Sequence, residues 1–201
     1  MLKLNLIDNQ LTYQYKCSDK YKEGFWGVGD YTLTYNTINE EASLFLYSFP
    51  ADEYVYAMSA QENSSTKYLA QSSYIDLLTP TYESKEVAGS YLETTGKYRA
   101  KGGYGPVYYD KYRELYYRFA FHPLPEKEAK FQVDPIDKQM PLSVIILDKH
   151  FAKIGETVLS YLKYDPYTVF ITKEGLHISH NKPDNEDELI FDIFLPTPIS
   201  E

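Results

Sequence analysis

Apolar and polar residues alternate over short stretches along most of the chain. Between residues 115 and 121, Leu115, Tyr117 and Phe119 fall on one face of an extended strand, whereas Tyr116 and Arg118 fall on the other. Similar alternation predicts strands over Leu2–Ile7, Leu11–Cys17, Tyr31–Tyr35, Ser43–Phe49, Tyr54–Met58, Lys67–Ala70, Pro106–Tyr109, Leu115–Phe121, Leu142–Leu147, Glu156–Leu159, Thr168–Thr172, Leu176–Ser179 and Leu189–Leu195. Polar turns separate them, and strand centres lie about ten residues apart, which is typical of an all-β antiparallel meander.

Gly175 gives the clearest turn signal. It predicts a hairpin between the strands at 168–172 and 176–179, because glycine readily adopts the positive φ of tight turns. Helical periodicity is weak by comparison. The best helix candidate, Ser73–Leu78, is one turn long and stops before Pro80. We expect the polar stretch from Pro80 to Gly103 to be a long loop or an irregular outer strand.

Two breaks in the alternation, at 80–103 and at the proline-rich 123–141, divide the chain into similar units. These are 25–72, 103–159 and 164–195, with a partial unit at 1–18. Units of about 40–50 residues with up to four antiparallel strands are typical of propeller blades. The prediction is therefore a single domain over 1–201, built of four-stranded antiparallel blades in a partial, about four-blade β-propeller-like arc. A β-sandwich or barrel stays open, because the units share no regular motif.

Composition narrows the possible partners. The 201 residues include 22 tyrosines, which favour strands and combine an apolar ring with a polar tip. The formal net charge of −9 and the lack of any basic run argue against nucleic acid, because tracking a phosphate backbone needs a basic patch. The single cysteine, Cys17, excludes an internal disulfide and a cysteine-based zinc site.

No membrane-spanning or export segment is predicted in this chain. No apolar run approaches the length of a membrane helix, and Asn5 and Asp8 interrupt the N-terminal stretch, so it is not a signal-peptide core. Cys17 follows Tyr15 and Lys16 rather than the small residues that a lipid-attachment site requires. An export signal would have to lie outside this chain.

The best candidate for ligand binding is a set of aromatic and basic residues in and around the predicted hairpin. It comprises Tyr109, Tyr112, Arg113, Tyr116, Arg118 and His122. Tyrosine rings stack on sugars and peptides, and arginine donates to carboxylates. The competing explanation is that these side chains pack against a neighbouring blade.

The sequence predicts no catalytic residues, no cofactor and no metal site. His177 and His180 are three apart on a strand, so they point to opposite faces. The acidic loop 184–188 lacks the spacing and the glycine of a calcium loop. Asp110 and Glu114 could form an acid–base pair, but Lys111 and Arg113 beside them favour ion pairing.

Five segments carry a resemblance to a known family. They are 48–61, 67–75, 102–125, 143–156 and 167–194, and the most specific is GPVYYDKYRELYYRF, which starts at Gly105. In this order they resemble the later part of a family of uncharacterised Gram-negative envelope lipoproteins with a TolB-like six-bladed β-propeller fold. The resemblance covers most of the chain from residue 43 onward.

This resemblance implies a location in the periplasm, at the outer membrane or at the cell surface, with membrane attachment only through a lipid anchor absent from this chain. Six blades of about 45 residues need roughly 270 residues. We therefore expect the N-terminal blades to be missing, either removed or lost to a start at an internal Met. An open ring leaves a strand edge and an apolar face bare, which predicts a homo-oligomer.

The predicted function is that of a non-enzymatic, envelope-associated, propeller-like protein. It would bind a carbohydrate or peptide ligand through a blade face or the central mouth of the ring. The alternative is a glycan-processing enzyme with its site on propeller loops, which would need converging carboxylates in one pocket. A purely structural assembly module is a third possibility.

Overall fold

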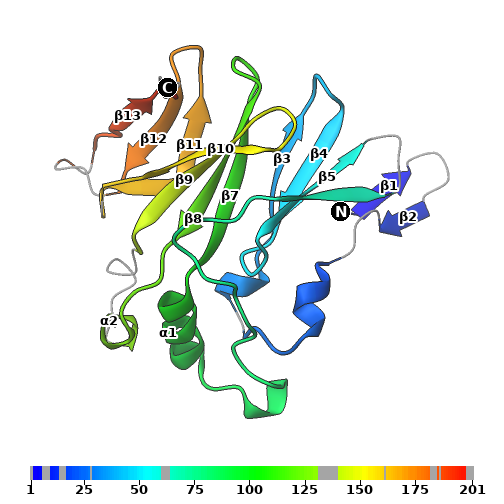
Figure 1. Ribbon diagram of the computed structural model, residues 1–201, viewed down its shortest axis with the longest axis vertical. Coiled ribbons are helices and arrows are strands. Elements are labelled where there is room, and N and C mark those ends of the chain that lie inside the picture. Colours follow the sequence, from blue (N-terminus) through cyan, green and yellow to red (C-terminus); the bar gives the residue numbers. More distant parts are fainter. Residues whose placement is uncertain are drawn as a thin grey trace.

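The computed structural model describes residues 2–5, 10–13, 17–27, 29–59, 64–130, 140–160, 162–181, 185 and 187–197 (Figure 1). Within these residues the regular secondary structure is mainly antiparallel β-sheet. Two α-helices, α1 (Tyr91–Lys101) and α2 (Glu126–Lys130), and short 3-10 helices at Asp19–Lys22, Asp30–Thr32 and Lys85–Val87 accompany the strands. In the part of the chain that the structure describes, neither α-helix is long and apolar enough to cross a membrane.

Three sheets carry the fold. The first sheet has the order β3 (Tyr35–Asn39), β4 (Leu44–Ser48), β5 (Tyr54–Ser59), β6 (Ser65–Leu69). The second has the order β10 (Lys153–Val158), β9 (Leu142–Leu147), β8 (Leu115–Phe121), β7 (Gly103–Asp110). The third has the order β11 (Tyr164–Ile171), β12 (Leu176–His180), β13 (Phe191–Phe194). A separate two-stranded sheet pairs β1 (Leu2–Asn5) with β2 (Gln10–Tyr13).

These sheets confirm the all-β antiparallel prediction. Each lies within one of the units predicted at 25–72, 103–159 and 164–195, and none closes into a barrel. The bounds of β8 and β9 match the alternation in the sequence. The predicted hairpin is confirmed as well: Ile171 pairs with Leu176, and Gly175 has φ +152°. An added Cβ at Gly175 would lie 2.5 Å from the carbonyl oxygen of Phe194, so the turn also needs glycine for space.

Three predictions about local structure are wrong. Residues 30–32 form a 3-10 helix, and the first strand of the sheet begins only at Tyr35. Ser73–Leu78 is not helical, whereas the supposed loop or strand at 80–103 contains the helix α1. Its periodicity is weak because it buries only Thr94, Tyr98 and Arg99.

A capping box starts α1. The hydroxyl of Ser90 accepts a hydrogen bond from the backbone N–H of Glu93, and the Glu93 carboxylate accepts one from the backbone N–H of Ser90 at 2.8 Å. The sequence carries this signal as Ser-Tyr-Leu-Glu, in which the serine and glutamate sit at the spacing of the motif. The cap, rather than an apolar stripe, therefore defines where the helix begins.

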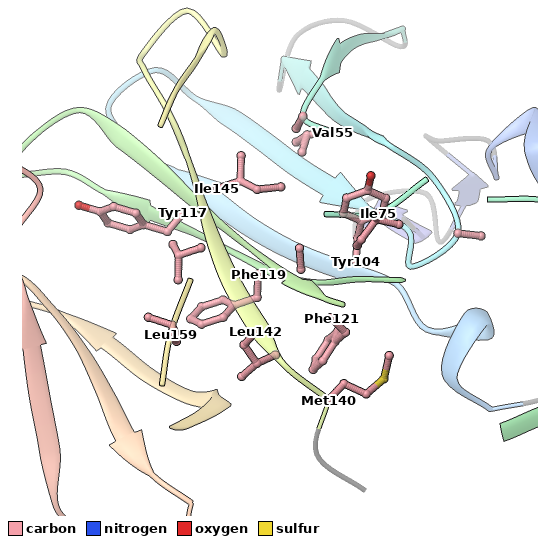
Figure 2. Close-up of a cluster of buried hydrophobic side chains, with 14 of the residues drawn as sticks. Val55, Ile75, Tyr104, Tyr117, Phe119, Phe121, Met140, Leu142, Ile145 and Leu159 are labelled. Carbon is pink, nitrogen blue, oxygen red and sulfur yellow. The ribbon is translucent and has the colours of Figure 1, made fainter. Parts of the chain in front are cut away.

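The second sheet lies between the other two. Its strand β7 neighbours both β3 and β11, and the turns β3–β4, β7–β8 and β11–β12 all lie along the upper edge in Figure 1, opposite α1. The main core clusters around β8 and β9, with Tyr117, Phe119 and Ile145 among its members (Figure 2). The strand β8 is buried on both faces: Asn39 of the first sheet donates to the Tyr116 hydroxyl on one face, and Tyr167 of the third sheet stacks on Phe121 on the other.

Loss of the cap should weaken the protein measurably. We expect Ser90→Ala to lower the free energy of unfolding by about 1 kcal/mol, because the first turn of α1 loses an acceptor for a backbone N–H. Urea unfolding followed by circular dichroism measures this change. Ser64→Ala, at an exposed position before β6, serves as the control and should change the free energy by less than about 0.5 kcal/mol. Equal effects of the two substitutions would contradict a role for the cap.

Candidate functional site

The structure does not bring the six predicted ligand-binding residues together. Tyr109 and Tyr112 line a surface pocket at the β7–β8 turn, and Arg113 supports the same turn from beneath. Tyr116, Arg118 and His122 are buried, with exposed fractions of 1%, 0% and 8%. For these three residues the burial fits the competing explanation, in which the side chains pack against a neighbouring sheet. Alternation at period two marks two distinct faces, but here both are covered by protein.

Arg118 joins the second sheet to the first. Its guanidinium donates to the carbonyl oxygens of Phe49, Asp52, Glu53 and Ala70 at 2.7–3.3 Å. Its Cζ lies 4.0 Å from the centroid of the Tyr104 ring. All these partners belong to the protein itself, so the guanidinium acts as a structural link between sheets.

His122 belongs to a buried polar network. Its Nε2 lies 2.8 Å from the hydroxyl of Ser143, and that hydroxyl donates to Glu156 at 2.6 Å. Because a serine hydroxyl carries one hydrogen, His122 must be the donor in its bond to Ser143. Burial lowers the pKa of His122, partly offset by the charge of Glu156. The ring of Tyr74 stacks on the His122 imidazole, with 4.6 Å between the two ring centroids.

Glu156 ties the outer strand β10 to the segment that follows β6. Its carboxylate accepts hydrogen bonds from the Ser72 hydroxyl at 2.6 Å, the Ser73 backbone N–H at 2.8 Å and the Lys153 ammonium at 2.7 Å. Burial alone would raise the pKa of Glu156, but these bonds and the one from Ser143 lower it to about 2. The carboxylate is therefore ionised at neutral pH and holds the two sheets together.

The order of groups in this network differs from that of a serine hydrolase. In such enzymes the imidazole lies between serine and carboxylate and takes the serine proton. Here Ser143 lies between His122 and Glu156, and its exposed fraction is 0%. The hydroxyl has no route to a substrate, so the arrangement supports packing rather than nucleophilic attack.

An open hollow of about 340 Å³ lies between the β3–β4 turn, the β7–β8 turn and the end of β11. We call it the turn pocket. Its lining combines aromatic, aliphatic and charged side chains from β3, β7, β11 and the turns after β3 and β7: Ile38, Glu40, Glu41, Tyr109, Lys111, Tyr112 and Ile171. The pocket brings together rings, carboxylates and one ammonium that are far apart in the sequence.

Arg113 braces the turn that carries Lys111 and Tyr112. Its guanidinium donates to Asp110 at 3.1 Å and to the carbonyl oxygens of Thr172 and Lys173 at 3.3 and 2.6 Å. The β7–β8 turn is thereby tied to the β11–β12 turn. Asp110 is fully buried, and its carboxylate also accepts bonds from the backbone N–H of Tyr112 and the hydroxyl of Tyr117.

Tyr109 forms a bridge between two of the turns. Its hydroxyl donates to the Glu41 carboxylate at 2.9 Å. Desolvation and this hydrogen bond raise the pKa of Tyr109 to about 12, so the hydroxyl stays protonated at neutral pH. Beneath Tyr109 runs a series of ring contacts through Tyr116 and Phe151 to Tyr68, with centroid distances of 5.0, 4.7 and 4.4 Å.

Several pocket residues carried no signal in the sequence. Ile38 and Glu41 come from the β3–β4 hairpin and Ile171 comes from the β11–β12 hairpin, and only the packing of β3 and β11 on β7 brings them together. Glu156 was likewise not predicted, because its partners Ser72 and Ser143 lie in distant segments.

No metal site emerges from the described part of the chain: no three His, Cys, Asp or Glu side chains there lie close enough to hold an ion. His177 approaches Thr172, whereas His180 approaches Asp192. In the acidic loop considered for calcium, Asp184 and Glu186 lie outside the described residues.

Comparison with known proteins places this fold in a family. A family model described as "Domain of unknown function (DUF4221)" matches residues 3–158. The chain belongs to the DUF4221 family. A DUF4221 crystal structure from Bacteroides vulgatus is similar, with 26% sequence identity and a TM-score of 0.69 over 84% of the present chain. This chain spans 46% of the length of that relative. None of the curated proteins compared with it matches.

Family membership supports the coarse part of the resemblance seen in the sequence. DUF4221 is a family without an assigned function, as expected from that resemblance. The TolB-like six-bladed arrangement, the lipoprotein anchor and the envelope location stay predictions for this DUF4221 chain.

Because of the Glu156 network, the stability of this DUF4221 chain should fall as the solution becomes acidic. The pKa of Glu156 is about 2 when folded, against an ordinary 4.5. A carboxyl with a lowered folded pKa stabilises the protein above its ordinary pKa, and this contribution is lost as the pH falls toward 2. We expect Glu156→Gln to lose about 1–3 kcal/mol of unfolding free energy at pH 7. The difference from the unsubstituted protein should shrink between pH 4.5 and pH 2.

Urea unfolding at a series of pH values measures this difference. Glu114→Gln is the matched control, because Glu114 forms a surface pair with Lys149 at 3.4 Å and is 60% exposed. It should cost less than about 0.5 kcal/mol at pH 7. A Glu156→Gln difference that stays constant down to pH 2 would contradict the assignment.

Proposed function

We propose that this chain is a binding module and that the turn pocket is its ligand site. The observation that supports this most is the convergence of two tyrosine rings with two carboxylates and an ammonium around one open hollow of about 340 Å³. Ligand pockets typically measure about 300–1,000 Å³ and combine an apolar wall with a few polar groups. Ile38 and Ile171 supply the aliphatic part of the wall.

We also propose that the three sheets are successive blades of a propeller. In support, their first strands β3, β7 and β11 lie side by side, and each sheet continues outward from its first strand (Figure 1). In such an arrangement the turn pocket lies at one mouth, beside the central axis, where propellers commonly bind ligands. The envelope location and the six-bladed TolB-like form belong to the same proposal and rest on the resemblance of the sequence.

A homo-oligomer is part of the proposal as well. In the described part of the chain, β13 pairs only with β12, so its other edge has no partner strand there. Phe170 and Ile193 on the third sheet are 44% and 54% exposed. Unpaired edges and apolar faces favour association, here with a second copy of the chain. Light scattering should give a mass above that of one chain, and a monomer would contradict this part.

A binding screen tests the ligand site. Soluble oligosaccharides and short peptides would be titrated against the protein by calorimetry or NMR. We expect at least one class to bind, and we expect Tyr112→Ala to weaken that binding about five-fold or more, because the ring is the most exposed aromatic surface in the pocket. Tyr91→Ala, at an exposed tyrosine of α1, should leave affinity unchanged.

Two results would contradict the proposal. One is the absence of any binding across both classes, and the other is binding that Tyr112→Ala leaves intact. The glycan-processing alternative stays a prediction, and the same oligosaccharide samples test it if they are analysed for hydrolysis products after incubation.

A further inference from the structure

The chemistry of the turn pocket favours one class of ligand. Resting on the proposed ligand site, we propose that the pocket binds the cationic side chain of a peptide, a lysine ammonium or an arginine guanidinium. The cation would lie against the tyrosine rings and between the carboxylates of the β3–β4 turn. Three features of the structure support this choice: the rings, the charges and the rigidity of the turns.

The rings offer faces to a cation. Tyr112 is 44% exposed, and the ammonium of Lys111 already lies 5.3 Å from its ring centroid. The negative face of an aromatic ring attracts cations, most strongly where water is partly excluded. Tyr109 also lines the pocket, and its ring packs against that of the buried Tyr116 with 5.0 Å between the centroids, so the core holds it in place. A bound cation would replace Lys111 over the Tyr112 ring.

The charges point the same way. The lining carries the carboxylates of Glu40 and Glu41, both on exposed residues, against the single ammonium of Lys111. The Tyr109 hydroxyl donates to Glu41 and so holds that carboxylate at the edge of the pocket. The net charge of the whole chain is −9, which draws cations toward the protein and repels anions. Both the carboxylates in the lining and the negative net charge would repel an anionic ligand.

The turns that carry these groups are braced before any ligand arrives. Arg113 ties the β7–β8 turn to the β11–β12 turn, and Asp110 holds the backbone N–H of Tyr112 at 2.9 Å. A site that is already ordered loses less conformational entropy on binding. A flexible lysine or arginine side chain is therefore the part that becomes ordered in the complex.

Four blocked tripeptides test the inference: acetyl-Ala-X-Ala-amide with X as Arg, Lys, Gln or Glu. NMR titration should show binding of the Arg and Lys peptides with dissociation constants on the order of 1 mM, and at least about five-fold weaker binding of the Gln and Glu peptides. Affinity for the cationic peptides should fall as salt is raised.

Single substitutions locate the site. Glu40→Gln should weaken binding of the Arg peptide about three- to five-fold, the worth of one exposed ion pair. Glu83→Gln removes the same charge from an exposed position on the segment before α1 and should have no effect beyond about 1.5-fold. Tyr112→Ala should weaken the Arg peptide by at least about five-fold.

The outcomes separate this inference from the proposed ligand site. Neutral oligosaccharides could bind in a manner that depends on Tyr112 while the cationic peptides do not bind. In that case the inference of a cationic ligand is wrong, but the proposal that the turn pocket is a ligand site is supported. If the Gln peptide binds as tightly as the Arg peptide, the cationic ligand is also wrong. If neither the oligosaccharides nor any of the peptides bind, both are wrong.

Discussion

The guanidinium of Arg118 has to find all its partners inside the protein, because none of its residue surface reaches solvent. Its two terminal nitrogens do so by donating to the carbonyl oxygens of Phe49, Asp52, Glu53 and Ala70, whereas its buried Nε–H has no hydrogen-bond partner among the described residues. Burial lowers the pKa of Arg118 to about 10, so the group remains charged at neutral pH. Burying a cation costs free energy, and hydrogen bonds to the charged group offset much of that cost. These four carbonyls thus have to stay where the first sheet places them.

The rest of the molecule follows from that link. Arg118 lies on the central strand β8, and its partners lie in the β4–β5 turn and just after β6, so the first and second sheets meet in one fixed arrangement. The Glu156 network adds a second tie between the same two sheets. Arg113 then ties the second sheet to the third. Three buried or half-buried charges therefore set the geometry in which the turn pocket forms.

Alternation along the sequence predicted most of the strands and their grouping into sheets, but it wrongly placed a strand at 31–35. The strands β8 and β9 were predicted residue by residue, because their rings and branched side chains repeat at period two. The helix α1 was missed, since its stability comes from the Ser90–Glu93 cap and from few buried residues, which leaves little periodicity to detect. Weighing capping-box spacing alongside hydropathy would have found it.

The candidate site was predictable only in part. Tyr109 and Tyr112 flank a polar turn, where exposed rings are expected, and the structure places both in the pocket. Arg118 was predicted to bind a ligand but is buried between sheets. A strand face that carries tyrosine and arginine shows the same sequence pattern whether water or another sheet covers it. The remaining pocket residues, such as Glu41 and Ile171, depend on which strands become neighbours. That information is non-local, and a single sequence does not display it.

The claim that a buried arginine links the sheets is tested most directly by equilibrium urea unfolding of Arg118→Lys. Unfolding would be followed through the fluorescence of Trp26, the only tryptophan, which is 3% exposed in the core. Lysine keeps the charge but lacks the planar fork that reaches several carbonyls at once. The account predicts a loss of about 2–4 kcal/mol of unfolding free energy, because carbonyls are left without donors. A loss below about 0.5 kcal/mol, as for an ordinary surface substitution, would contradict it.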